Sequence, residues 1–253
     1  MRLRGNDGVF AGAIPELYER HLVPLSFEPY AADIASRVAQ RGPLRTLEIA
    51  AGTGAATRHL ARALPESASI VATDLNQPML DKAAAVGTAR PVEWRQADAM
   101  RLPFADEAFD AVVCQFGAMF FPDKRTAFSE ARRVLRRGGV FVFSVWDRIE
   151  CNDFAEIVTR SVAMLWPDDP PGFLARIPHG YHDTSLIAED LRQGGFTRTP
   201  EFSTLAERSR ADSAQRAAMA YCHGTPLRTE IETRDASRLA EATNVASAAI
   251  ADR

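Results

Sequence analysis

The strongest constraint on the fold is a regular alternation of short apolar segments with amphipathic segments between residues 45 and 146. Three of the intervening segments, 55–64, 77–86 and 124–136, carry apolar residues at helical spacing. Strands that alternate with helices in this way form a parallel sheet covered on both faces. The sequence therefore predicts a Rossmann-like, doubly wound α/β fold with five strands at 45–50, 69–74, 92–96, 109–114 and 140–146.

Two further regions flank this core, which spans residues 44–148. Residues 1–43 carry two helical patterns, one around Leu17 and one around Ile34, and predict an N-terminal helical cap. Residues 149–253 predict a proline-rich lid inserted after the fifth strand at 150–180, a sixth strand at 196–205 and C-terminal helices.

Composition and charge argue against several classes of function. The net charge of -3 provides no basic face of the kind that nucleic-acid binding requires. No signal peptide is expected at the N-terminus, and no run reaches the ~18 apolar residues of a membrane span. Three widely spaced cysteines suit free thiols in the cytoplasm. No metal is expected, because His, Cys and carboxylate residues show no metal-ligand spacing.

The turn after the first strand has the sequence LEIAAGTG, residues 47–54. Gly52 and Gly54 lack a Cβ atom, which lets the backbone turn tightly and approach a ligand closely. The helix that follows offers free N–H donors at its start. A GxG turn has many structural uses, so its meaning depends on the residues around it.

Three carboxylates stand on the first three strands or at their ends. Asp74 comes 20 residues after Gly54, where a carboxylate can accept hydrogen bonds from two ribose hydroxyls. Asp98 could accept from an adenine amino group, and Glu48 would be costly to bury without a partner such as a ligand amine. Structural roles stay open, namely Asp74 as a helix cap, Asp98 as a turn residue and Glu48 as the partner of a nearby arginine.

Together these residues resemble the class I S-adenosylmethionine-dependent methyltransferases, in particular the UbiE-like, type 11 branch that acts on small molecules. The resemblance implies S-adenosylmethionine as cofactor and in-line methyl transfer to oxygen, nitrogen or carbon of a small-molecule acceptor. It covers residues 18–196 and is carried by five blocks: LEIAAGTG (47–54), VATDLNQPML (71–80), ADAMRLPF (97–104), FDAVVCQFGAMFFPD (109–123) and RVLRRGGVFVFSVW (133–146).

The resemblance also implies which residues bind the cofactor. Four residues of the glycine loop line the methionine part, five residues near the second and third strands hold the ribose and adenine, and three lie near the sulfonium. In that order they are Glu48, Ala50, Gly52 and Gly54; Asp74, Leu75, Met79, Asp98 and Ala99; and Gln115, Phe116 and Tyr18. For Tyr18, a place in the core of an amphipathic helix is an equal alternative.

Two departures from the family are visible. The family often has glycine where this chain has Ala50. Its sheet also usually closes with a seventh strand, antiparallel to the sixth, and this strand is expected to be missing before Arg253. The second departure bears on the order of the sheet edge more than on cofactor binding.

No catalytic residue is assigned from the sequence. Of five histidines, His179 and His182 border the predicted lid, and a helix start at Asp183 favours a structural role for His182. Two alternatives remain besides a methyltransferase: a non-catalytic S-adenosylmethionine-binding or scaffold protein, and an NAD(P)-dependent dehydrogenase. The dehydrogenase is disfavoured because the third glycine of GxGxxG is absent after Gly54. Assembly into a homo-oligomer is left open.

Overall fold

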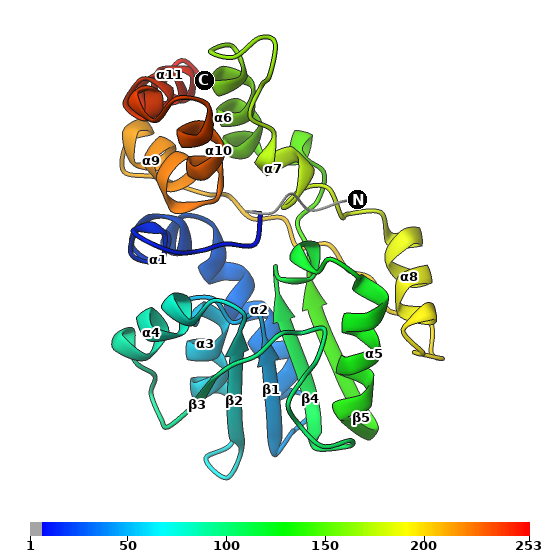
Figure 1. The fold of residues 1–253 in the computed structure, drawn as a ribbon. Helices are drawn as coiled ribbons and strands as arrows, with labels where there is room; N and C mark the ends of the chain where they lie inside the picture. The colour runs from blue at the N-terminus through cyan, green and yellow to red at the C-terminus, as the bar shows by residue number, and fades with distance from the viewer. Residues whose placement is uncertain (1–6) are drawn as a thin grey trace. The chain divides into compact units, whose positions relative to one another are not determined.

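The computed structural model describes residues 7–253, which divide into two compact units (Figure 1). The sheet unit comprises Glu28–Val145 and Asp183–Glu207. Among the described residues, the helical unit comprises 7–27, Trp146–His182 and Arg208–Arg253. None of the helices within residues 7–253 combines the length and the apolarity that crossing a membrane requires.

The sheet unit contains one five-stranded sheet in the order β3-β2-β1-β4-β5, and every strand pairing is parallel. The predicted Rossmann-like fold is thereby confirmed. The order reverses between β1 and β4, so the carboxyl ends of these two strands flank the place where such sheets bind ligands. The strands are β1 (Arg45–Ile49), β2 (Ser69–Asp74), β3 (Glu93–Gln96), β4 (Phe109–Gln115) and β5 (Leu135–Ser144).

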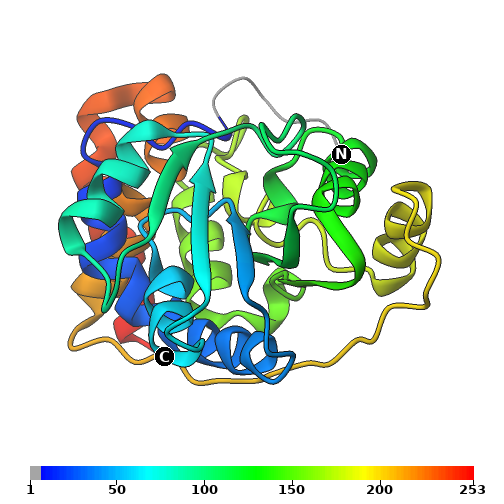
Figure 2. The same ribbon diagram turned by 90° about the horizontal axis from the view of Figure 1, so that it is seen from below.

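Helices cover both faces of this sheet (Figure 2). The blue helices α2 and α3 lie on one face, and the green helix α5 lies on the other. Phe128 of α5 packs against Phe141 and Phe143 of β5, with ring centroids 5.8 and 5.4 Å away. The helices are α2 (Glu28–Ala39), α3 (Ala55–Ala63), α4 (Gln77–Val86), η2 (Ala118–Phe120), α5 (Lys124–Val134) and α8 (Thr184–Gln193).

Two expectations about the sheet are wrong. Residues 196–205 form no strand, because Pro200 cannot donate to a ladder and Phe202 leaves 49% of its surface exposed. The helix predicted over 124–136 ends at Val134, and β5 begins at once. A register shift between the pairs Phe109–Leu135 and Ala111–Val140 absorbs the intervening residues of β5.

The helical unit is built almost entirely of helices. Its α9 packs against both η1 and α11. Gly224 allows the close approach to η1, since an added Cβ would lie 3.3 Å from the backbone nitrogen of Tyr18. Pro24 lies inside the π-helical η1. The elements are α1 (Ile14–Leu17), η1 (Tyr18–Phe27), η3 (Ile149–Cys151), α6 (Asp153–Ala163), α7 (Phe173–Arg176), α9 (Ala214–Gly224), α10 (Leu227–Asp235), η4 (Ala236–Arg238) and α11 (Leu239–Ala251).

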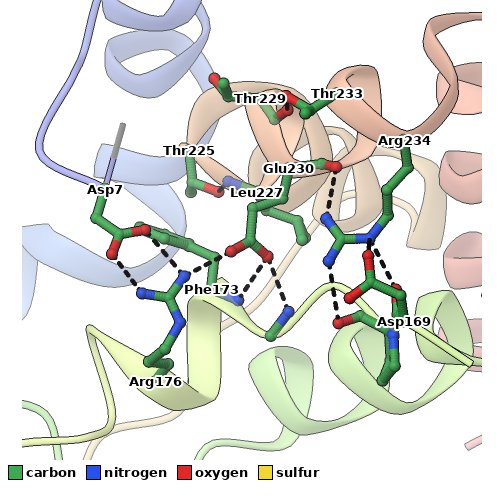
Figure 3. A network of polar contacts seen from close by, with 12 residues as sticks. Asp7, Asp169, Phe173, Arg176, Thr225, Leu227, Thr229, Glu230, Thr233 and Arg234 are labelled. Atoms are coloured by element: carbon green, nitrogen blue, oxygen red, sulfur yellow. Dashed lines mark hydrogen bonds and ion pairs between the residues drawn. The ribbon is translucent and has the colours of Figure 1, made fainter. Parts of the chain in front are cut away.

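A largely buried ion cluster joins three segments of the helical unit that are distant in sequence (Figure 3). Arg176 donates to both carboxylate oxygens of Asp7 and to Glu230 Oε1. Glu230 Oε2 accepts from the backbone nitrogens of Gly172 and Phe173, at 2.8 and 3.0 Å, and so satisfies the start of α7. The cluster therefore fixes α7 between the N-terminal segment and α10.

Replacing Arg176 with methionine should destabilise the protein by about 3 kcal/mol, because two mostly buried carboxylates would lose their cation. The measurement is the free energy of unfolding in urea. The control is Arg192→Met, which removes an exposed guanidinium from an exposed Glu189 and should change stability little. Equal effects of the two substitutions would contradict the structural role of the cluster.

Candidate functional site

The glycine loop after β1 contains several residues in the left-handed region. Gly52 has φ +57° and Gly54 has φ +83°, and Ala50 adopts φ 54° despite its side chain. The nitrogen of Ala51 donates to the carbonyl of Thr73, 2.9 Å away, at the end of β2. The loop therefore turns sharply at the carboxyl edge of the sheet, with its backbone held by the neighbouring strand.

Gly54 is required here for two separate reasons. Its φ value disfavours any residue with a Cβ atom. In addition, a Cβ at this position would lie 2.9 Å from Trp94 of β3 and 3.3 Å from Ala83 of α4. Gly52 differs, because its Cβ would meet only Met79 at 3.6 Å, an ordinary contact distance.

Asp74, the last residue of β2, is buried and ties the loop to its own strand. Its Oδ2 accepts from the nitrogen of Gly52 and its Oδ1 from the nitrogen of Asn76, both at 2.8 Å. Burial raises the pKa of Asp74, and these N–H donors oppose the rise. Asp74 thus bonds both the glycine loop and the turn before α4, whose N-cap residue is Asn76 and which has no side-chain cap bond.

Glu48 lies inside β1 and is almost completely buried. Its Oε2 accepts from the hydroxyl of Thr57 at 2.6 Å, so its bonded partner is a hydroxyl on α3 rather than an arginine. Burial raises the pKa of Glu48 to about 8, and the negative charge of Asp74 adds to the rise. The carboxyl is therefore mostly protonated at neutral pH and would ionise beside a cation.

The residues expected around adenine and ribose lie along the ends of β2 and β3. Leu75 leaves 56% of its surface exposed, whereas Met79 is buried beside Gly52. Asp98 is exposed and its Oδ1 accepts from the nitrogen of Met100 at 2.8 Å, in agreement with the turn alternative. Ala99 lies in the same turn, which is partly exposed.

Gln115 and Phe116 stand at the end of β4, directly beside the glycine loop in strand order. Phe116 has φ 51°, like Ala50 at the end of β1. Gly117 follows Phe116, and an added Cβ there would collide with the side chains of Ala50 and Cys114. Two non-glycine residues in the left-handed region at one sheet edge indicate that this edge is held under local strain.

Tyr18 belongs to the helical unit, where its ring contacts Phe27 at a centroid distance of 5.2 Å. Its predicted place near the cofactor stays a prediction.

The sequence analysis did not identify Thr57 and Trp94, which contact Glu48 and the position of Gly54. No local pattern marks either residue, because both act through contacts with residues far along the chain.

One buried polar atom in the loop has no partner among residues 7–253. The hydroxyl of Thr53 is enclosed between Gly52 and Gly54, and the side chain is only 1% exposed. Buried hydroxyls normally form a hydrogen bond. The loop therefore combines an unused polar atom, a backbone that lacks Cβ atoms and two buried carboxylates, which suits a polar ligand with an amine and hydroxyl groups. No group of three or more His, Cys, Asp or Glu in this described part of the chain could hold a metal.

In sequence, this chain is similar to known methyltransferases. Residues 47–143 match the family model described as a methyltransferase domain. The uncharacterized protein Rv1405c of Mycobacterium tuberculosis is 31% identical over 177 residues, covering 69% of this chain and 61% of the relative. The ubiquinone/menaquinone biosynthesis C-methyltransferase UbiE of Teredinibacter turnerae is 35% identical over 138 residues, covering 53% of this chain and 50% of the relative. The chain thus spans less than two thirds of the length of these relatives.

Solved structures share the fold. The [4+2]-cyclase SpnF superposes with a TM-score of 0.54 at 21% sequence identity, covering 89% of this chain and 74% of that one. The methyltransferase-domain match over residues 47–143 and the parallel sheet agree with the resemblance of this chain to the class I S-adenosylmethionine-dependent methyltransferases.

Replacing Gly54 with alanine should destabilise the protein more than the same change at Gly42. Both residues have positive φ, which costs alanine about 1–2 kcal/mol. Only at Gly54 would the new Cβ also collide with Trp94, adding about 1–3 kcal/mol, since an added Cβ at Gly42 meets nothing within 4 Å. Urea unfolding of both variants measures the difference, and equal losses would contradict the close packing of the loop.

Proposed function

We propose that this protein transfers a methyl group from S-adenosylmethionine to a small-molecule acceptor. The observation that carries the proposal is the joint placement of Gly52, Asp74 and Glu48 at the carboxyl edge of β1 and β2. When bound, S-adenosylmethionine supplies an activated methyl group on a positively charged sulfonium. The protein then has to position the two reactants and exclude water.

Different residues of the sheet unit would bind different parts of the cofactor. Asp74 accepts from the nitrogens of Gly52 and Asn76 and from the side-chain amide of Asn76. It would accept from the ribose hydroxyls through its remaining lone pairs. Glu48 would face the amine of the methionine part, where its carboxyl would become ionised. The glycine loop, lined also by Ala50, would hold the methionine backbone, and the residues near adenine and the sulfonium would be Leu75, Met79, Asp98, Ala99, Gln115 and Phe116.

A small-molecule acceptor is favoured by charge. The chain carries 30 Lys and Arg against 33 Asp and Glu, which offers no excess of cations for a nucleic-acid substrate. The acceptor atom, the oligomeric state and the cytoplasmic location stay predictions from the sequence. So does the division into a cap at 1–43, a core at 44–148 and a C-terminal region at 149–253.

Replacing Asp74 with alanine should weaken the binding of S-adenosylmethionine at least about tenfold, equivalent to about 1.4 kcal/mol. Titration calorimetry measures the affinity, and thermal unfolding checks that the variant folds. Asp81→Ala is the matched control, because Asp81 is an exposed carboxylate on α4 that accepts from the side chain of Gln77 on the same helix.

A ligand lacking the ribose hydroxyls separates the proposed contact from a general loss of loop order. The 2′,3′-dideoxy form of S-adenosylhomocysteine should bind wild type and Asp74→Ala with similar affinity, whereas S-adenosylhomocysteine itself should distinguish them. An equal loss for both ligands would show that Asp74 acts only by holding Gly52 and Asn76.

Binding of S-adenosylmethionine should release about one proton per site at pH 7. The pKa of Glu48 lies at about 8 in the free protein, so the carboxyl is protonated below that pH, and a ligand ammonium would lower the pKa. Affinity should therefore rise with pH up to about 8 and then level off. Calorimetry in buffers of different ionisation enthalpy measures the proton count. Glu48→Gln should abolish the release, and unchanged release would place the proton elsewhere.

A second candidate function is a protein that binds S-adenosylmethionine without transferring its methyl group. The fold alone leaves it open, because SpnF, which shares the fold, is named for a different reaction, a [4+2] cyclisation. Mass analysis after incubation with labelled cofactor and a panel of phenols, quinols and acids distinguishes the two functions. Binding without any labelled product would support the second candidate, and binding of NADH alone would support a dehydrogenase.

A further inference from the structure

The residue that follows β4 adopts the left-handed region, and an aromatic ring of α2 packs against its side chain. Phe116 has φ 51°, a conformation that strains residues with a Cβ atom. Its ring is buried and lies 5.4 Å from the ring of Tyr30, edge to face. Both residues belong to the sheet unit, and Tyr30 stands in the first turn of α2. A specific ring contact therefore accompanies the strained backbone.

Two neighbouring strands hold the backbone of the same turn. The nitrogen of Phe116 donates to the carbonyl of Ser144, 3.1 Å away at the end of β5. Gly117 packs so closely after β1 that an added Cβ would lie 2.4 Å from the Cβ of Ala50. Strained conformations of non-glycine residues persist only where the surroundings over-determine them. The strands restrain the backbone of the turn, and the contact with Tyr30 restrains the side chain of Phe116.

Tyr30 is held at its hydroxyl as well as at its ring. Burial raises the pKa of Tyr30, a hydrogen bond from the backbone of Glu207 to the hydroxyl opposes the rise, and the charge of Glu207 adds to it. The phenol therefore stays neutral at pH 7. Because different parts of Tyr30 make the two contacts, replacing Tyr30 with phenylalanine removes the hydroxyl contact and keeps the ring contact with Phe116.

The turn lies at the edge of the sheet where the cofactor is proposed to bind. All strands are parallel and β1 and β4 are neighbours, so β4 ends beside the glycine loop. Gln115 and Phe116 are among the residues proposed to lie near the sulfonium. An aromatic ring attracts a cation, whereas the neutral thioether of S-adenosylhomocysteine lacks this attraction. The orientation of Phe116 therefore bears on how strongly the charged ligand binds.

We propose that Tyr30 is a positioning residue, whose ring holds Phe116 in the orientation that favours the sulfonium of S-adenosylmethionine over a neutral thioether. The inference rests on the proposed methyl transfer and adds a residue outside the predicted set of cofactor contacts. Tyr30 acts through Phe116 and is not proposed to touch the ligand. Without the ring of Tyr30 the strained turn loses one restraint, and Phe116 relaxes toward negative φ.

This preference matters for the reaction, because methyl transfer converts the charged sulfonium into the neutral thioether. A site that favours the sulfonium binds the substrate more tightly than the product, which helps the product to leave. The same orientation keeps the methyl group aligned for in-line transfer. The ratio of the affinities for S-adenosylmethionine and S-adenosylhomocysteine measures the preference directly, and no acceptor has to be known for that measurement.

The variants that test the proposal are Tyr30→Leu, which removes the ring, and Tyr30→Phe, which removes only the hydroxyl. Tyr30→Leu should lower the affinity for S-adenosylmethionine, relative to that for S-adenosylhomocysteine, by about threefold or more, the size of a weak cation–π contact. Tyr30→Phe should keep the wild-type ratio. Titration calorimetry with each ligand measures the affinities, and thermal unfolding checks that each variant folds.

The matched control is Phe104→Leu. Phe104 is partly buried, like Tyr30, and its ring packs edge to face on Phe109 at 5.1 Å. Phe109 begins β4, at the edge of the sheet opposite to Phe116. The control therefore removes a comparable ring from the other end of the same strand. It should lower the unfolding temperature, as Tyr30→Leu does, and leave the ratio of the two affinities unchanged.

Action through Phe116 is tested in a second background. Phe116→Gly has no ring to orient, and glycine adopts positive φ without strain. Phe116→Gly alone should lower the ratio, and adding Tyr30→Leu to it should cause no further fall. A further fall would overturn the action through Phe116. An equal loss of affinity for both ligands in Tyr30→Leu would show a merely structural role and overturn the proposal.

These failures differ from failure of the proposed function, which would appear as wild type that binds neither ligand. If Phe116→Gly does not fold, the single variants at Tyr30 still decide, since an equal fall in Tyr30→Phe and Tyr30→Leu would overturn the role of the ring. If Tyr30→Leu does not fold, Phe116→Gly still decides, because an unchanged ratio in that variant would overturn the preference assigned to Phe116.

Discussion

The site depends on the carboxylate of Asp74, which holds the glycine loop in place before any ligand arrives. Its two oxygens accept from Gly52 and Asn76, and the neighbouring carbonyl of Thr73 accepts from Ala51. The end of β2 thereby fixes the turn that follows β1. The left-handed conformation of Gly52 needs this support, because a glycine left unconstrained samples many conformations. The residue proposed to bind ribose is thus the same one that preorganises the loop.

The two buried carboxylates of the sheet unit have different environments and therefore different uses. Asp74 receives backbone N–H bonds that oppose the cost of burying its charge. Glu48 receives only one hydroxyl, from Thr57, and its pKa of about 8 leaves it mostly neutral. A neutral carboxyl in a buried strand is tolerated in the free protein and would gain a partner if a cation bound. The pair thus separates a fixed acceptor, which shapes the loop, from a carboxyl whose charge is proposed to respond to the ligand.

Local pattern was sufficient to predict the sheet but not every element around it. The strand at 69–74 and the helix at 77–86 were predicted with the bounds observed, because apolar runs there end at clear turn residues. The sixth strand was wrong, since residues 196–205 form no ladder with the five-stranded sheet, although the ring of Phe196 stacks on Phe141. Contacts such as Thr57 to Glu48 and Trp94 to Gly54 depend on the folded arrangement, so spacing along the chain could not reveal them.

The division between cofactor and acceptor follows from where the family resemblance ends. The family model covers residues 47–143, which include the glycine loop and both buried carboxylates. The hydrogen bonds by which Asp74 and Glu48 hold the loop join residues between 48 and 76, all inside the matched range. Substitutions outside that range leave both partners of each of these bonds in place. The same loop can therefore be retained by chains that differ beyond residue 143, and a shared sheet does not by itself define the acceptor.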